Sequence, residues 1–175
     1  NFSRQAGRLD LALSDIEKAL ELEPDNLPIQ QRALALFLDS GDAALLERGE
    51  GLLDKALQAN PGDIELKLSK AQSLLRRETA PPTEQARRLL REITAESPKL
   101  PRAWVLLCTL ELREDEVGEA LDAALQGLAH NPQNRQLLLL KARAEGRRSP
   151  MLAVPTLRGL FDRDPNDTGV VSLLA

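Results

Sequence analysis

Apolar residues recur every three or four positions along most of the 175-residue chain. This spacing predicts amphipathic helices, because residues three and four apart share one face of a helix. A representative stretch contains Leu45, Leu46, Leu52, Leu53, Ala56 and Leu57. No stretch shows the alternation that would predict a strand. We therefore expect an all-α protein.

Prolines divide this pattern into periods. Five prolines follow Leu- and Ala-rich stretches at intervals of 37, 37, 34 and 33 residues: Pro24, Pro61, Pro98, Pro132 and Pro165. Each predicts a helix end, because proline cannot continue a helix and restricts the residue before it. Four of the prolines are followed, two residues later, by an Asn or Asp that suits the N-cap of the next helix. These residues are Asn26, Asp63, Asn134 and Asp167.

A second break falls inside each period, at residues 40–42, 80–83, 114–116 and 148–150. Gly41 suits a helix end and Asp42 the start of the next helix, while Thr83 and Ser149 suit N-caps, the latter with Pro150 in the first helical position. Each period therefore predicts two helices of about 12 to 16 residues.

The periods predict one array of units. The units span residues 27–63, 64–100, 101–134 and 135–167, flanked by partial units 1–26 and 168–175. Because both ends interrupt a unit and the last one lacks a polar outer face, we expect either a piece of a longer array or disordered flanks.

The array resembles the tetratricopeptide repeat (TPR) family over nearly the whole chain. The clearest unit, residues 101–132, matches the family pattern at Trp104, Leu107, Cys108, Ala120, Gly127 and Pro132. It departs from the pattern at Glu111, where a Tyr is usual, and at Ala124, where a large residue is usual. The resemblance implies a right-handed α-solenoid of antiparallel helix pairs; a simple helical bundle is the alternative.

Small residues recur at one position of the second helices and predict close helix packing there: Ala12, Gly49, Ala86, Ala120 and Ala153. Gly51 has no comparable packing reason. Trp104 is expected in the core between the two helices of its unit, and a ring that stacks on a ligand is the alternative.

Composition excludes several classes of function. Lys and Arg number 23 against 27 Asp and Glu, and this net charge of −4 argues against a general nucleic-acid binder. No apolar run approaches the roughly 20 residues of a membrane span. One Cys and one His are too few for an internal disulfide or a zinc site. We expect a soluble chain, cytoplasmic or periplasmic, with neither metal nor cofactor.

The reactive side chains favour structural interpretations over catalysis. His130 lies at a predicted helix C-terminus, where the helix dipole favours a positive charge. Cys108 occupies a position where the repeat packs a small residue, and no basic residue that could stabilise a thiolate is expected beside it. The acidic residues 114–116 suit a solvated turn better than a cation site. The sequence therefore predicts no catalytic residue.

The resemblance implies a concave groove lined by the first helix of each unit, where the family usually binds peptides. The predicted contact residues are Leu68, Gln72, Leu75 and Arg76; Arg102, Val105, Thr109, Leu112 and Arg113; and Gln136, Leu139, Arg143 and Arg147. They mix apolar side chains with arginine, and residues 135–148 carry a net charge of +4. The expected partner is an acidic peptide or protein with apolar anchors.

Several functions stay open. The carboxylate clamp of TPR chaperone adaptors is absent, because the innermost groove positions hold Gln31, Leu68, Val105 and Leu139. The favoured function is a non-catalytic protein-interaction scaffold. The alternatives are a regulatory or targeting arm of a larger enzyme, such as a glycosyltransferase or kinase, and a structural spacer. The spacer would serve a bacterial envelope or polysaccharide-export assembly and self-associate through open array ends.

Overall fold

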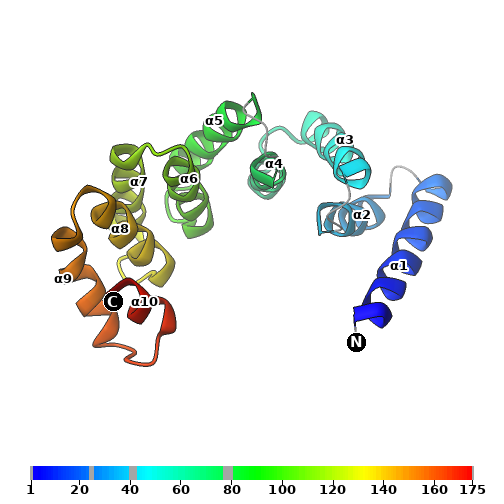
Figure 1. Cartoon of the computed structure of the whole chain (residues 1–175). Helices are drawn as coiled ribbons and strands as arrows, with labels where there is room; N and C mark the ends of the chain where they lie inside the picture. Colours follow the sequence, from blue (N-terminus) through cyan, green and yellow to red (C-terminus); the bar gives the residue numbers. More distant parts are fainter. Residues whose placement is uncertain (1, 24–25, 40–42, 77–80, 175) are drawn as a thin grey trace. The chain divides into compact units, whose positions relative to one another are not determined.

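The computed structural model describes residues 2–23, 26–39, 43–76 and 81–174. Every regular element in these ranges is a helix (Figure 1). The helices are α1 (Phe2–Leu22), α2 (Leu27–Asp39), α3 (Ala43–Ala59), α4 (Ile64–Arg76), α5 (Pro81–Glu96), α6 (Pro101–Arg113), α7 (Val117–His130), α8 (Arg135–Arg148), α9 (Pro150–Phe161) and α10 (Thr168–Leu174). The all-α prediction is confirmed.

The helices form two compact units, Asn1–Arg76 and Arg77–Ala175. In the first unit, α1 packs on α2, α2 on α3 and α3 on α4. In the second unit, each helix from α5 to α10 packs on the next one along the chain, and α6 also contacts α8. This succession of neighbours is typical of a repeat array, in which each pair of helices buries its apolar faces against the adjacent pair.

The prolines end helices as their positions predict. Pro61, Pro98, Pro132 and Pro165 lie in the turns that follow α3, α5, α7 and α9. Pro24 lies outside the described residues.

The predicted N-caps are also present. Asn26, Asp63, Asn134 and Asp167 each accept a hydrogen bond from a backbone N–H two or three residues ahead, at 3.0 to 3.2 Å. Each cap satisfies a backbone donor that a helix start leaves unpaired, which stabilises the helix by about 1 kcal/mol.

One predicted helix start is wrong. Helix α5 begins at Pro81, so Thr83 lies inside its first turn and is not an N-cap. Proline is tolerated there because the first helical N–H has no partner within the helix. Ser149 does precede α9 with Pro150 in the first helical position, although its hydroxyl makes no capping bond. The predicted break at residues 40–42 lies outside the described residues.

Small residues allow the close packing that the sequence predicts. Gly49, Ala86, Ala120 and Ala153 are buried, and Ala12 is half-buried. Gly51, for which the sequence offers no packing reason, has open space around it.

Trp104 lies in the core. It is 6% exposed, and its indole N–H donates to the Pro98 carbonyl at 2.8 Å. A Cβ added to Gly127 would lie 2.8 Å from the Trp104 Cβ, so only glycine fits beneath this side chain. The expectation that Trp104 is a packing residue agrees with this burial.

None of the helices in the described ranges is both long enough and apolar enough to cross a membrane.

Candidate partner-binding site

The second unit contains a cavity of about 650 Å³ formed by α6, α8 and α9, with one residue from α10. We call it the basic cavity. Its lining residues are Thr109, Leu112, Arg113, Leu140, Ala142, Arg143, Gly146, Arg147, Pro150, Ala153, Leu157 and Leu173. The walls are mainly apolar, and the three arginines supply all the charge, because no Asp or Glu is among these lining residues.

Arg147 contacts the last turn of α6 and the loop that follows it. Its Nη1 donates to the carbonyl oxygen of Leu112 at 2.6 Å and lies 3.0 Å from Oδ1 of Asp115. Asp115 has a φ of 62°, a left-handed conformation that is uncommon for a residue other than glycine. This ion pair is exposed and contributes little to stability, but it fixes the direction of the guanidinium.

Arg143 differs from Arg147 in its surroundings. Its side chain is exposed, and within the described part of the chain it has no hydrogen-bond or ion-pair partner. A guanidinium has five N–H donors in a planar fork that matches a carboxylate. Arg143 can therefore bind an anionic group without first breaking a contact inside the protein.

The structure brings together five of the thirteen predicted contact residues. Thr109, Leu112, Arg113, Arg143 and Arg147 all line the basic cavity. Leu112 is largely buried there and forms part of the wall.

The other predicted residues of the second unit lie on the same two helices but outside the cavity. Arg102 and Gln136 are exposed, Val105 is half-buried, and Leu139 packs against the core cluster around Leu157.

In the first unit, one predicted contact residue is wrong. Leu68 is only 1% exposed, so its side chain cannot reach a partner in this structure. The reason is that α4 is buried over a broad arc that includes Lys67, Leu68, Lys70, Ala71, Ser73 and Leu74. On the rest of α4, Gln72 and Leu75 are half-buried and Arg76 is exposed.

Sequence reasoning missed the wall that α9 and α10 contribute. Ala153, Leu157 and Leu173 come from these helices and close one side of the basic cavity. The small residues Ala142 and Gly146 mark where α8 and α9 approach each other, since a Cβ on Gly146 would lie 3.7 Å from the Ala153 Cβ. In the sequence, this pair of small residues one helical turn apart could have indicated that another helix packs against α8 at this point.

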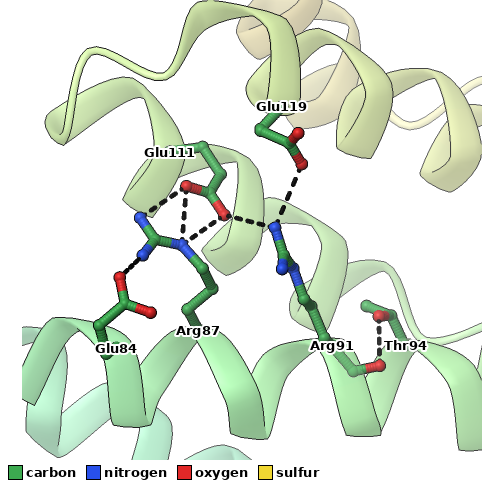
Figure 2. Close-up of polar contacts among 6 residues, drawn as sticks. All are labelled: Glu84, Arg87, Arg91, Thr94, Glu111 and Glu119. Carbon is green, nitrogen blue, oxygen red and sulfur yellow. Dashed lines mark hydrogen bonds and ion pairs between the residues drawn. The ribbon is translucent and has the colours of Figure 1, made fainter.

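Two arginines of α5 are paired with carboxylates of the neighbouring helices. Glu111 on α6 is 1% exposed, and its carboxylate accepts hydrogen bonds from Nε and Nη2 of Arg87 on α5, each at 2.9 Å (Figure 2). Arg91 lies 3.8 Å from Glu111 and 3.2 Å from Glu119, and Glu84 contacts Arg87 from the same helix. The hydrogen bond that Arg87 donates to Glu111 raises the pKa of the Arg87 guanidinium above its usual value.

This network explains the departure from the family pattern at Glu111. A buried carboxylate is costly unless it is paired, and Arg87 and Arg91 supply that pairing from the preceding helix. The network therefore fixes α5 against α6 and has a structural role.

The two side chains with reactive chemistry lie apart from the basic cavity. Cys108 is fully buried, and its thiol lies 3.2 Å from the Ala120 carbonyl oxygen. Burial, with a smaller contribution from Glu111, raises the pKa of this thiol to about 12, so almost no thiolate forms near neutral pH. His130 is exposed in the last turn of α7. Within the described ranges, no three His, Cys, Asp or Glu residues come close enough together to hold a metal ion.

Helix pairs stacked in sequence order, with a cavity lined chiefly by the first helices of successive pairs, define an α-helical repeat protein. No protein-family model matches the sequence, and no curated protein matches it. Solved structures do. One of them is YrrB, described as a TPR protein with an unusual peptide-binding site. It matches with a TM-score of 0.71 at 17% identity, and the match covers 98% of this chain and 86% of YrrB.

Two other matches agree. A TPR protein from Parabacteroides merdae has a TM-score of 0.77 at 17% identity, covering 97% of this chain and 66% of its own. MamA matches with a TM-score of 0.72 at 17% identity, and the match covers 93% of this chain and 86% of MamA. The chain therefore has the TPR-like repeat fold that its sequence predicts.

Proposed function

We propose that this protein is a non-catalytic protein-interaction scaffold whose basic cavity binds an acidic segment of a partner. The observation that carries the proposal is the cavity itself. Apolar walls and three arginines line it without a carboxylate, and Arg143 has no partner within the described part of the chain. A volume of about 650 Å³ is within the usual range for ligand pockets and holds several side chains.

The chemistry of the lining selects the ligand. Arginine binds carboxylates through two parallel hydrogen bonds, which gives orientation as well as affinity. The leucine and alanine walls favour an apolar side chain next to the acidic group. Because Arg147 is already oriented by Leu112 and Asp115, little of its side-chain freedom is lost on binding.

We assign the contact role to Thr109, Leu112, Arg113, Arg143 and Arg147, with the α9 and α10 wall as the apolar anchor site. Peptide binding is described for YrrB, which shares the fold, and that supports a peptide or an extended segment as the ligand. A non-catalytic role also agrees with the positions of the two reactive side chains. Cys108 is buried, His130 is exposed, and neither lines the basic cavity.

The proposal is tested by fluorescence anisotropy with a labelled peptide that alternates glutamate and leucine. We expect saturable binding that weakens as the salt concentration rises, because the arginines are partly exposed to solvent. A peptide that alternates lysine and leucine is the control and should not compete. Equal binding of both peptides would mean that the cavity recognises apolar side chains alone and would contradict the proposed role of the arginines.

A further inference from the structure

The second unit contains another cavity, of about 440 Å³, among α5, α6 and α7. We call it the acidic groove. Trp104 and Leu107 of α6 form its buried apolar part, and Glu119 and Asp122 of α7 line it with exposed carboxylates. Its volume is within the usual range for ligand pockets, so the groove has room for a side chain of another molecule.

The acidic groove and the basic cavity lie on different sides of α6. Trp104, Leu107 and Glu111 line the groove, and their spacing of three and four residues places them on one face of the helix. Leu112 and Arg113 line the basic cavity and lie on another face. The groove is therefore a separate site, and a ligand bound there would not occupy the basic cavity.

An equivalent groove in the first unit shows what the repeat requires at this place. It lies among α1, α2 and α3 and has a volume of about 510 Å³. An ion pair crosses each groove, from Glu17 to Arg48 in the first unit and from Arg91 to Glu119 in the second (Figure 2). Arg91 follows Glu17 by two periods of 37 residues, and Glu119 follows Arg48 by periods of 37 and 34 residues. The two pairs thus occupy corresponding positions with their charges exchanged.

Asp122 is the charge that this pairing leaves over. It is exposed, lines the acidic groove and has no hydrogen-bond or ion-pair partner within the described part of the chain. The corresponding position of the first unit holds Gly51, so the repeat does not require a carboxylate there. Two acidic and two basic side chains line the groove of the first unit, whereas three carboxylates and one arginine line the acidic groove. The acidic groove therefore has an excess of negative charge that a cationic ligand would neutralise.

The lining of the acidic groove fits an arginine side chain. Glu119 and Asp122 are three residues apart on one face of α7, so a planar guanidinium with five N–H donors can bridge their carboxylates. Glu119 keeps acceptor capacity, because Arg91 donates to its Oε2 alone, at 3.2 Å. The apolar side chains of Trp104 and Leu107 suit the methylene stem of arginine. Lysine carries its charge at a single point and matches a pair of carboxylates less well.

We propose that the acidic groove binds an arginine side chain of a partner protein, with Asp122 as the main acceptor and Glu119 as the second. This site does not rest on the function proposed above, so either can fail without the other.

The test is an NMR titration of the whole, isotopically labelled chain with the short peptide acetyl-Gly-Ala-Arg-Ala-Gly-amide. Trp104 and His130 are the only Trp and the only His of the chain, and both line the groove, so their ring signals report on this site. We expect saturable shifts of both signals with a Kd on the order of 1 mM, as suits contact with a single side chain. A peptide with lysine in place of arginine should bind more weakly. A peptide with citrulline, the neutral analogue of arginine, should cause no saturable shift.

A matched pair of variants tests the role of Asp122. Asp122→Asn keeps the shape of the side chain and should raise the Kd of the arginine peptide about fivefold, because a charge-assisted hydrogen bond is about twice as strong as a neutral one. Asp162→Asn makes the same change in charge at an exposed position of α9 outside the groove and should leave the Kd unchanged. Circular dichroism should show unchanged helicity in both variants, since both side chains are exposed.

Three results would overturn the proposal: no shift of either ring signal, binding of the citrulline peptide as tight as that of the arginine peptide, or equal weakening in the two variants. Equal binding of the lysine peptide would overturn the assignment of arginine as the ligand.

Discussion

Helix α6 has two contrasting environments in the second unit. Toward α5, the arginines 87 and 91 are paired with Glu111 and Glu119. Toward α8 and α9, no Asp or Glu lines the basic cavity. Arg147 is paired with Asp115 of the next turn, whereas Arg143 has no partner within the described residues. The comparison teaches that arginine content alone does not mark a binding site; what matters is whether the chain itself supplies the acceptors.

The same two regions differ in how tightly a glycine is packed. Beneath Trp104, a Cβ on Gly127 would collide with the indole side chain at 2.8 and 2.9 Å. At the wall of the basic cavity, a Cβ on Gly146 would meet the Ala153 Cβ at an ordinary distance of 3.7 Å. The acidic groove, a cavity of about 440 Å³, also lies among α5, α6 and α7, but Glu111, Glu119 and Asp122 line it. The two regions therefore both have room for another molecule and differ in whether carboxylates line that room.

The largest effect should come from breaking the ion-pair network around Glu111. Glu111→Ala removes the acceptor of Arg87 and should lower the free energy of unfolding by about 3–5 kcal/mol, as for other broken buried ion pairs. Urea denaturation followed by circular dichroism measures this change. Glu114→Ala, at an exposed position three residues further on, is the control and should stay within about 0.5 kcal/mol.

A double substitution sharpens this result. Glu111→Leu with Arg87→Leu removes both charges and should recover much of the lost stability, because it leaves no buried charge unpaired. If Glu111→Ala unfolded at the same urea concentration as the original chain, the network would have no structural role.

A smaller loss should follow from Gly127→Ala. The added methyl group overlaps Trp104, and overpacking of this kind costs about 1–3 kcal/mol, more than the gain in helix propensity. Thermal unfolding followed by circular dichroism and tryptophan fluorescence measures the loss and the displacement of the only Trp. An unchanged midpoint would show that the region is less tightly packed than its contacts indicate.

The smallest of the stability effects should be a gain at the cavity. Gly146→Ala should stabilise the chain by about 0.5–1 kcal/mol, because alanine is the better helix former and its methyl group fits. Gly159→Ala, where an added Cβ meets nothing within 4 Å, is the matched control and should give a similar gain in urea. A loss at Gly146 alone would mean that the cavity wall has no room to spare.

Local chemistry made much of the fold predictable from the sequence. Prolines and the N-caps that follow them act on their own neighbours in the chain, so Pro61 with Asp63 and Pro132 with Asn134 could be interpreted without tertiary information. The same holds for Trp104 and Gly127, whose positions match the repeat pattern.

Features that depend on distant packing could not be predicted. The partner of Glu111 is Arg87, 24 residues earlier, and only the stacking of α5 on α6 brings them together. The spacing of residues along α4 placed Leu68 on the groove stripe, but it could not show how much of that helix its neighbours cover. For the same reason, the arginines of the basic cavity could be predicted from the sequence, whereas the wall formed by Leu157 and Leu173 could not.

The central claim is that Arg143, which has no partner within the described residues, and Arg147, which contacts Leu112 and Asp115, bind an acidic partner. The most direct measurement compares the Kd of the glutamate–leucine peptide for two double variants with the same change in charge. Arg143→Glu with Arg147→Glu alters the cavity, whereas Arg88→Glu with Arg163→Glu alters exposed arginines of the same unit outside it. We predict a Kd at least about tenfold higher for the first variant and a change of less than about twofold for the second. Equal weakening in both variants would contradict the account, because it would show attraction to the overall charge and no role for the basic cavity.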